Sequence, residues 1–325
     1  MKPVCEGWTR DSEKPCYHYI KGGFCSLPIL FRCAEFMRQQ MPTLSHSGVQ
    51  DWVCKRRFWW AYVVGLELIE PPLPMLQGRI ASNILDQIHT TGTYKKSIFE
   101  QFRKEDELPI WALKMEGLFD SYIPIYGEMR GKTQARFQWF EDGYPQVKGF
   151  LDLVIYDDHI SYEYKYTARP ESYTKFVIQD QFSTYFLGRP DLQRITLRLI
   201  RVPELRLGKR EPTKEYIERV REDFTRRPGY YIKDENFWRT EFDLNATKEK
   251  MRRVANEISQ FCGERNKMLA FYQANSPGTC YLPQPCKFLT ICTSNDTVSE
   301  NVYKRRNKEE PSDIQWLDEK EGQNG

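Results

Sequence analysis

An aspartate, a glutamate and a lysine are the residues whose types and spacing most clearly suggest chemistry. They lie in residues 147–167, which read as two β-strands because an apolar run is followed by alternating aromatic and charged side chains. A turn at residues 157–158 would place Asp152 opposite Glu163 on one face of the hairpin. Lys165 lies two residues beyond Glu163 and therefore points to the same face.

This group of side chains is typical of a site for a hard divalent cation. Two carboxylates a few ångströms apart repel each other, and a cation between them relieves the repulsion. Oxygen-only ligands favour magnesium or manganese, which can activate water and stabilise charge on a phosphate beside a lysine. The spacing alone equally fits a solvent-facing ladder of charged side chains on an amphipathic hairpin.

Composition limits the classes of protein that the chain can belong to. It has 325 residues with 40% hydrophobic and 14% aromatic side chains, enough for a substantial core, and its formal net charge is only +3. Any contact with nucleic acid must therefore come from local basic patches. The first residues lack an apolar segment, and the longest apolar run, near residues 58–66, is far below the roughly 20 residues that span a bilayer. We expect a cytoplasmic protein without a membrane partner.

The chain has nine cysteines, which in a cytoplasmic protein indicate metal or cluster ligation more than disulfides. Four of them lie in residues 1–40, a short segment broken by glycine and proline, for which a structural zinc ion would explain folding. Their spacing does not match a standard zinc finger, so reduced thiols without a ligand remain the alternative. These candidate zinc ligands are Cys5, Cys16, Cys25 and Cys33.

A second group of cysteines stands near the other end of the chain. Cys280, Cys286 and Cys292 are regularly spaced, and three thiolates call for a fourth ligand. Cys54 is the natural candidate, because a shared metal or cluster would then join the first long helical segment to the end of the core. The neighbouring Cys262 fits a buried thiol on an apolar helix stripe instead.

Two predicted helices carry polar residues on one face. In the helix expected to start at Gly78, Ser82, Asp86 and His89 share a face, which either is solvated or looks into the metal site. In the helix expected over residues 172–188, Gln181 and Tyr185 lie four positions apart. Their function depends on what lies opposite these faces.

Basic side chains form two local groups. The first follows Cys54 in the chain, and the second lies on the strand predicted near residues 193–202. Either could hold a phosphate backbone, although a charged edge strand in solvent would look the same. The candidate DNA-binding residues are Lys55, Arg56, Arg57, Arg194 and Arg198.

In this order, the segments resemble the RecB-like branch of the PD-(D/E)XK nucleases, which includes CRISPR-associated and AddB-type enzymes with an iron–sulfur cluster. The resemblance covers roughly residues 45–292 and rests on the lone-cysteine helix LSHSGVQDWVCKRRFWWAYVVGLE, on GFLDLVIYDD followed by ISYEYKY, on QFSTY, and on the late cysteines. It implies that Asp152, Glu163 and the Tyr164 carbonyl bind magnesium or manganese. It also implies that Lys165 acts on the attacking water or the phosphate.

The resemblance further implies that Gln181 and Tyr185 position the phosphate and Lys165, and that the four cysteines 54, 280, 286 and 292 hold an iron–sulfur cluster. Two positions depart from the family. The metal-binding histidine expected four residues after Gly78 is replaced by Ser82. Either Asp86 or His89 replaces it or holds metal-bound water, or the third ligand is water and the activity is weak. Both gaps between the late cysteines contain five residues, which leaves a four-iron cluster or a zinc ion open.

Together these observations predict an α/β fold of the restriction-endonuclease type, a mixed sheet flanked by helices with a cysteine-stapled helical part. The expected domains are a cysteine-rich appendage at 1–40, a nuclease core at 41–292 and a polar, partly disordered tail at 293–325. The expected function is metal-dependent hydrolysis of DNA phosphodiesters, as an exonuclease on single strands or DNA ends in repair, recombination or phage or CRISPR DNA processing. The alternatives are a catalytically weak DNA-binding or assembly subunit and a structure-specific endonuclease.

Overall fold

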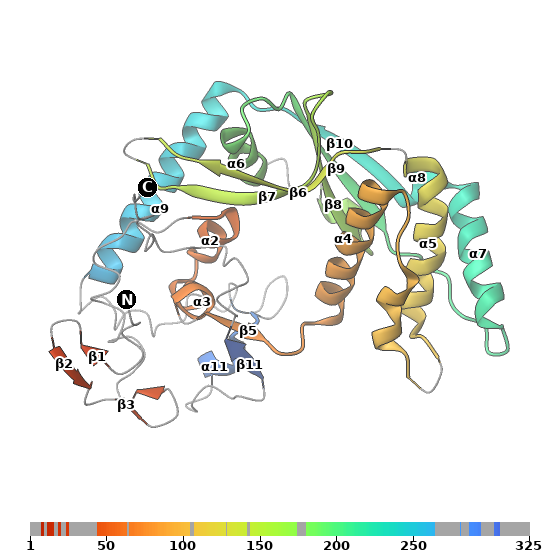
Figure 1. The fold of residues 1–325 in the computed structure, drawn as a ribbon, viewed down its shortest axis with the longest axis horizontal. Coiled ribbons are helices and arrows are strands. Elements are labelled where there is room, and N and C mark those ends of the chain that lie inside the picture. Colours follow the sequence, from red (N-terminus) through yellow and green to blue (C-terminus); the bar gives the residue numbers. More distant parts are fainter. Residues whose placement is uncertain are drawn as a thin grey trace, which may run out of the picture. The chain divides into compact units, whose positions relative to one another are not determined.

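The fold was obtained as a computed structural model of the chain, shown in Figure 1. Most of the predicted zinc cysteines lie outside the described residues; Cys25 falls in the short strand β4, whose backbone alone is described. The predicted zinc site is therefore neither supported nor opposed. The structure describes residues 8–9, 12–15, 19–20, 24–25, 44–63, 65–104, 107–127, 129–141, 144–173, 180–263, 280, 286–293 and 302–305.

The chain divides into two compact units, each made of separate stretches of sequence. The first comprises Met1–Glu70, Gln138–Gly149 and Asn245–Gly325, and the second comprises Pro71–Phe137 and Phe150–Leu244. The predicted hairpin residues Asp152, Glu163 and Lys165 belong to the second unit, whereas the four predicted cluster cysteines belong to the first.

A five-stranded mixed sheet forms the frame of the fold, with the order β10-β9-β8-β7-β6. Strands β7 and β8 are antiparallel, β8 and β9 are parallel, and β9 and β10 are antiparallel. The parallel pair needs a crossover, which helix α6 (Asp180–Gly188) provides. The predicted mixed sheet flanked by helices is thus confirmed. The strands are β6 (Lys132–Trp139), β7 (Val147–Ile155), β8 (Ile160–Thr167), β9 (Arg194–Arg201) and β10 (Ile232–Phe237).

The predicted hairpin and its register are confirmed. Leu153 pairs with Tyr162 and Ile155 with Ile160, which is the register that a turn centred on residues 157–158 requires. The turn includes four residues and is closed by a hydrogen bond of 3.1 Å from the His159 amide to the Tyr156 carbonyl. Strand β6 lies next to β7, so β6, β7 and β8 are neighbours in the sheet.

Helices cover both faces of this sheet. On one face, helices α4 (Leu73–Thr91), α5 (Ile110–Tyr126) and α7 (Thr213–Arg226) lie beside the strands (Figure 1). The core between them includes Ile84, Phe119 and Tyr164, and each buried side chain of this size contributes about 1.5–3 kcal/mol. On the other face, Phe182 of α6 packs against Phe237 of β10 with a centroid distance of 4.7 Å.

Helix α4 begins five residues earlier than the predicted start at Gly78. Pro74 occupies the first turn, where the helix needs no amide hydrogen from it. The helix ends at Gly92, whose φ of +88° is a left-handed cap, with a bond of 2.7 Å from its amide to the Ile88 carbonyl.

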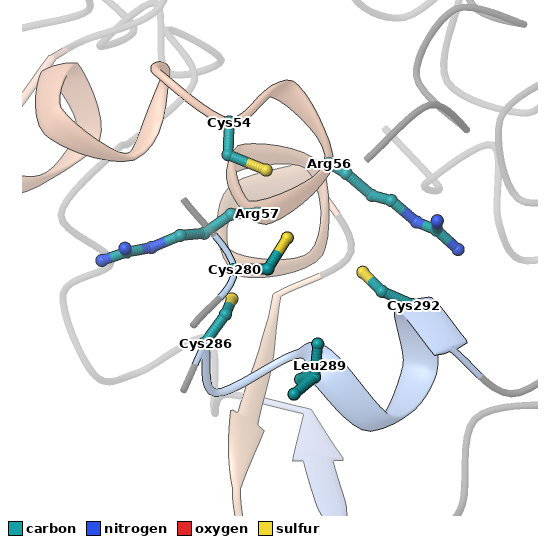
Figure 2. Close-up of a pocket in the computed structure, with 7 residues that line it drawn as sticks. All are labelled: Cys54, Arg56, Arg57, Cys280, Cys286, Leu289 and Cys292. Carbon is teal, nitrogen blue, oxygen red and sulfur yellow. The ribbon is translucent and has the colours of Figure 1, made fainter. Parts of the chain in front are cut away.

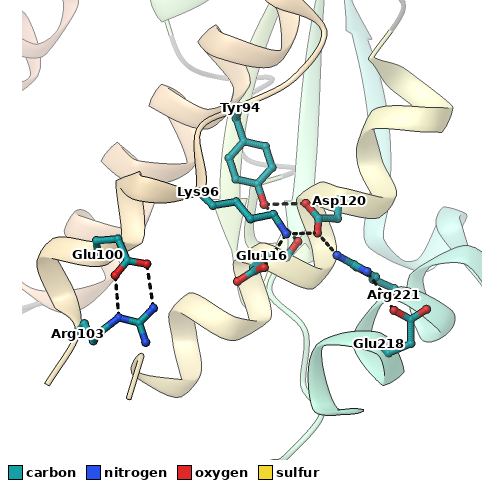
Figure 3. Close-up of polar contacts among 8 residues, drawn as sticks. All are labelled: Tyr94, Lys96, Glu100, Arg103, Glu116, Asp120, Glu218 and Arg221. Atoms are coloured by element: carbon teal, nitrogen blue, oxygen red, sulfur yellow. Dashed lines mark hydrogen bonds and ion pairs between the residues drawn. The ribbon is translucent and has the colours of Figure 1, made fainter. Parts of the chain in front are cut away.

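A partly exposed polar cluster joins α5 to α7 and to the segment before α5 (Figure 3). Asp120 accepts hydrogen bonds from the Tyr94 hydroxyl at 2.9 Å, from the Lys96 ammonium at 3.0 Å and from the Arg221 guanidinium. Lys96 also bonds to Glu116 at 2.7 Å. Because these groups satisfy one another, the cluster stabilises the helical layer and leaves no charge free for chemistry.

The first unit contains the segment around Cys54, which we predicted as one continuous helix. That prediction is wrong: α2 (His46–Asp51) ends at Trp52, and a new helix, α3 (Lys55–Phe58), starts after Cys54. Cys54 has extended backbone angles, with φ of −114° and ψ of 101°. The Ser45 side chain caps the N-terminus of α2. After α2 the chain makes a tight turn, in which the Cys54 amide donates a hydrogen bond of 3.1 Å to the Asp51 carbonyl.

Strand β5 (Leu66–Leu68) pairs antiparallel with β11 (Tyr303–Arg305), a strand in the polar tail of the chain. None of the helices in the described ranges has the length and apolar character needed to cross a membrane. The remaining elements are β1 (Trp8–Thr9), β2 (Ser12–Pro15), β3 (Tyr19–Ile20), β4 (Phe24–Cys25), η3 (Trp59–Val63), η4 (Lys96–Phe102), α8 (Pro228–Tyr231), α9 (Glu241–Gly263) and α11 (Leu289–Thr293).

Candidate functional site

Glu163 is the centre of a group of polar side chains on the α6 face of the sheet. It is 3% exposed, and the Lys165 ammonium donates a hydrogen bond of 2.5 Å to its Oε1. From α6, the Gln181 amide donates to Oε1 at 3.1 Å and the Tyr185 hydroxyl donates to Oε2 at 3.3 Å. The predicted helix face with these two residues therefore looks at the predicted glutamate.

Asp152 lies at the point where the ladder between β7 and β8 stops. The last pair of the ladder is Leu153 with Tyr162, and Asp152 Oδ2 instead accepts a hydrogen bond of 2.9 Å from the Tyr164 amide. Burial, and next the negative charge of Glu163, raise the pKa of Asp152 to about 7 against the opposing effects of Lys165 and the Tyr164 amide. The two predicted carboxylates thus interact strongly with each other.

Asp86 of α4 adds a third carboxylate to this region. Its charge also raises the pKa of Asp152, and burial raises the pKa of Asp86 itself to about 6. The Gln134 amide donates to Asp86 Oδ1 at 3.4 Å. Gln134 has a φ of 47°, a left-handed conformation that is uncommon for residues other than glycine and is often found at functional sites.

His89 points away from the carboxylates, into the helical face of the sheet. It is 1% exposed, and its Nδ1 lies 3.0 Å from the Met129 carbonyl while its Nε2 lies 3.0 Å from the Tyr164 hydroxyl and 3.3 Å from the Tyr122 hydroxyl. A carbonyl accepts only, so Nδ1 carries the proton and Nε2 accepts. Burial lowers the pKa of His89 to about 4, which keeps it neutral near neutral pH. Of the two candidate substitutes for the family's histidine, Asp86 is therefore the one placed with the acids.

Arg198, predicted as a DNA-binding residue, is instead buried, and this corrects the sequence-based interpretation. It is 3% exposed and makes two hydrogen bonds to the Asp234 carboxylate, at 2.8 and 2.6 Å. It also donates to the Tyr122 hydroxyl at 3.0 Å, and its guanidinium stacks over the rings of Tyr126 and Tyr162. The alternation of β9 turned this side chain into the core, where no phosphate can reach it.

The other basic residues predicted to bind DNA already have neighbours of their own. Lys55 lies 3.4 Å from Glu257 and over the Trp52 ring, and Arg57 lies 2.6 Å from Asp51. The remaining two are Arg56, which lines the cysteine pocket described next, and Arg194, which is half-buried at the start of β9. Their contact with DNA stays a prediction.

The four predicted cluster cysteines of the first unit line one pocket (Figure 2). Their sulfur atoms point toward a common space, while Arg56 and Arg57 extend to either side of it. A hydrogen bond of 2.7 Å from the Cys286 amide to the Cys280 carbonyl folds the late segment. Burial raises the pKa of Cys286 and of Cys292, and the charges of Arg57 and Arg56, respectively, oppose that rise.

Both groups of ligand-type residues fit a metal by the chemistry of their donors. Within the described ranges, no three histidine, cysteine or acidic side chains are arranged closely enough to count as a formed metal site. The carboxylates of Asp152, Glu163 and Asp86 are oxygen donors of the kind that magnesium and manganese prefer, and Asp152 carries the electrostatic strain that a cation would relieve. Four thiols around one pocket are the donor set of an iron–sulfur cluster or a tetrahedral zinc ion.

Two residues of the site were missed in the sequence. Gln134 was not named although it contacts Asp86, and Phe137 was not named although its ring lies against Tyr185 at a centroid distance of 5.4 Å. Both lie on β6, where the strand period of two could have been used to predict which side chains point toward the site. The side of the sheet to which the Gln134 side chain points depends on the positive φ of this residue, which no sequence pattern indicates.

Comparison with known proteins finds solved structures that align with the chain at low sequence identity. No protein-family model matches the chain, and no curated protein matches its sequence. A candidate exonuclease from Eubacterium rectale aligns with 82% of this chain and 92% of its own length, at 13% identity and a TM-score of 0.48. A phage-related exonuclease from Haemophilus somnus aligns with 56% of this chain and 93% of its own, at 15% identity and a TM-score of 0.32. At these values, an argument about function has to rest on the residues of the site.

Proposed function

We propose that the chain is a metal-dependent nuclease that hydrolyses DNA phosphodiesters, acting as an exonuclease on single strands or DNA ends. The observation that carries the proposal is the grouping of Asp152, Glu163 and Lys165 on the α6 face, where burial and next the charge of Glu163 raise the pKa of Asp152. A solvent-facing ladder would not have a glutamate that is 3% exposed and bonded by three separate donors.

Each side chain has a role that follows from its contacts. Asp152, Glu163 and Asp86, with the Tyr164 carbonyl, would hold magnesium or manganese, which supplies Lewis-acid stabilisation of the phosphate when bound. Lys165 orients the attacking water or neutralises charge that develops on the phosphate. Gln181 and Tyr185 hold Glu163 in place and leave Lys165 beside it.

The test is a nuclease assay with manganese on labelled single-stranded and duplex DNA. We expect Lys165→Ala to lower the cleavage rate by about 100-fold or more while DNA binding remains. Lys233→Ala is the matched control, because Lys233 also pairs with a glutamate two residues away on a strand, Glu235, at 2.5 Å, but stands exposed on β10. Full activity of Lys165→Ala, or an equal loss in the control, would refute the assignment.

A DNA-binding or assembly subunit with weak catalysis is the second candidate. Ser82 stands where the family has its metal-binding histidine, and no three ligand-type side chains of the described residues form a finished metal site. This candidate predicts DNA binding with no manganese-dependent cleavage by the wild-type chain. Product lengths in the same assay separate an exonuclease, which releases short products from ends, from a structure-specific endonuclease.

We also propose that Cys54, Cys280, Cys286 and Cys292 hold a four-iron iron–sulfur cluster, with a zinc ion as the alternative. The support is the single pocket that the four side chains line. A sample purified without oxygen should be brown, with a broad visible absorbance band and about four iron and four sulfide per chain. One zinc per chain in a colourless sample would favour the alternative, and a folded sample free of metal would end both.

A further inference from the structure

Phe150 is a large apolar side chain left in solvent beside the candidate site. It lies on β7 two residues before Asp152, so both side chains point to the same face of the sheet. Phe150 is 43% exposed, whereas its neighbours along the strand, Leu151 and Leu153, are fully buried in the opposite face.

The surroundings of Phe150 are aromatic but already packed. On the same face, Phe137 and Tyr185 are 3% and 7% exposed and contact each other. A large part of the Phe150 ring therefore stays outside this core. Burying that part against a partner would contribute favourable free energy, because apolar surface would be removed from water. A partner with a flat apolar surface would bury the ring in this way.

The position of Phe150 indicates what that partner is. A nucleotide combines a phosphate with a flat ring, and the site beside Phe150 is the one that we assign to the phosphate. Residues two apart on a strand are about 7 Å apart, which is comparable with the reach from a phosphate to a base of its own or the next nucleotide. Aromatic rings stack on bases of any sequence, since every base has a π-face.

We propose that a nucleobase next to the scissile phosphate stacks on Phe150, so that the site prefers single strands and frayed ends to closed duplex. The inference rests on the proposed nuclease function and deepens it. A base inside a duplex has both faces covered by its stacked neighbours and cannot reach the phenyl ring. An unpaired base has a free face and can.

The experiment compares Phe150→Ala with Phe150→Trp, which keeps an aromatic face. Phe242→Ala is the control, because Phe242 is 80% exposed on another element, the first turn of α9. Binding of a fluorescent single-stranded oligonucleotide is measured by anisotropy in EDTA, and cleavage by KM and kcat in manganese. We expect Phe150→Ala to raise Kd and KM about tenfold or more with kcat little changed, Phe150→Trp to retain affinity, and the control to match wild type.

A second set of substrates tests the stacking itself. One abasic nucleotide is moved stepwise through the oligonucleotide, and at one position it should weaken binding to wild type as much as Phe150→Ala does. At that position the variant should lose nothing more, because the stacked base and the ring form one interaction. The inference would be overturned if the abasic site and Phe150→Ala weakened binding independently, so that their effects on Kd multiplied. It would also be overturned if Phe150→Ala bound the single strand as tightly as wild type, or if it weakened binding to closed duplex equally. Absence of cleavage by wild type would overturn the nuclease function alone, since the binding assay in EDTA still decides the role of Phe150.

Discussion

The two faces of the sheet at strand β8 both gather ionisable side chains and use them in opposite ways. On the α6 face, Glu163 and Lys165 stand with Asp152, and repulsion between the carboxylates remains. On the helical face, Tyr164 stacks on His89 at a centroid distance of 5.5 Å, and the charge of Arg198 is met by a carboxylate and a hydroxyl.

The difference shows how to separate a site from a buried polar network. In the helical-face network each named donor has an acceptor: Arg198 donates to Asp234 and to Tyr122, and His89 accepts from Tyr164. Such a closed set stabilises one arrangement of the core. On the α6 face, the carboxylates gather negative charge that the single Lys165 does not offset. An excess of negative charge is the condition that favours binding of a cation.

The largest expected effect is a loss of nuclease activity when a carboxylate on the α6 face is removed. Glu163→Gln should lower manganese-dependent cleavage about 1,000-fold, because it removes a charge that the site needs. The free energy of unfolding should change by less than about 1 kcal/mol, since the lost ion pair with Lys165 is balanced by lower repulsion with Asp152. Urea unfolding and the nuclease assay check both parts. A large loss of stability would place Glu163 with the structural residues.

The opposite change tests the helical face. Arg198→Met should cost about 3–5 kcal/mol in the free energy of unfolding, because Asp234 and the Tyr122 hydroxyl lose their buried partner. Arg194→Met, on the same strand but half-buried, should cost less than about 1 kcal/mol. If the Arg198 variant keeps its stability but loses DNA binding, the original sequence-based role would be restored.

The two faces should also respond to pH in opposite directions. The folded protein lowers the pKa of His89 from 6.5 to about 4, so its contribution, roughly 3 kcal/mol, is present above pH 6.5 and is lost as the pH falls to about 4. The folded protein raises the pKa of Asp152 from 3.8 to about 7, so its contribution is present below about pH 4 and is lost as the pH rises to 7.

Urea unfolding of the metal-free protein between pH 4 and 8 measures both contributions. His89→Gln should reduce the loss of stability on the acid side, and Asp152→Asn should reduce the loss toward neutral pH. Identical pH profiles for wild type and both variants would contradict the assignment of these groups.

The smallest expected effect comes from one hydroxyl. Tyr164→Phe removes the hydrogen bond of 3.0 Å to His89 but keeps the ring and the backbone amide that binds Asp152. We expect a loss of about 1 kcal/mol in the free energy of unfolding, with cleavage close to wild type. Thermal or urea unfolding, run beside the nuclease assay, measures it. A strong loss of cleavage would show that the two faces are coupled through the strand.

The sequence was most informative where one local rule decides the geometry. The register of β7 and β8 follows from a turn at residues 157–158, and it correctly placed Asp152 near Glu163. The helical spacing of Gln181 and Tyr185 correctly put both on one face. In these cases the period of the backbone alone determines which side chains meet.

The sequence was least informative where tertiary packing decides. His89 and Asp86 share a polar helix face, yet one turns into a tyrosine cluster and the other toward the acids. Arg198 looked like a phosphate ligand because its partner Asp234 lies on β10, a strand that we did not predict. The break at Cys54 coincides with a tight turn back to the Asp51 carbonyl, and no glycine or proline in residues 51–55 indicates it.

The crossover helix between β8 and β9 links the geometry of the site to the rotation of α6 about its own axis. Gln181 and Tyr185 reach Glu163 only because α6 arrives with a particular rotation about its axis. A shift of one residue in the helical register of α6 would turn both side chains by about 100° around the helix axis and away from Glu163. The strands on either side could pair as before, so the site is more sensitive than the sheet to the register of this one short helix.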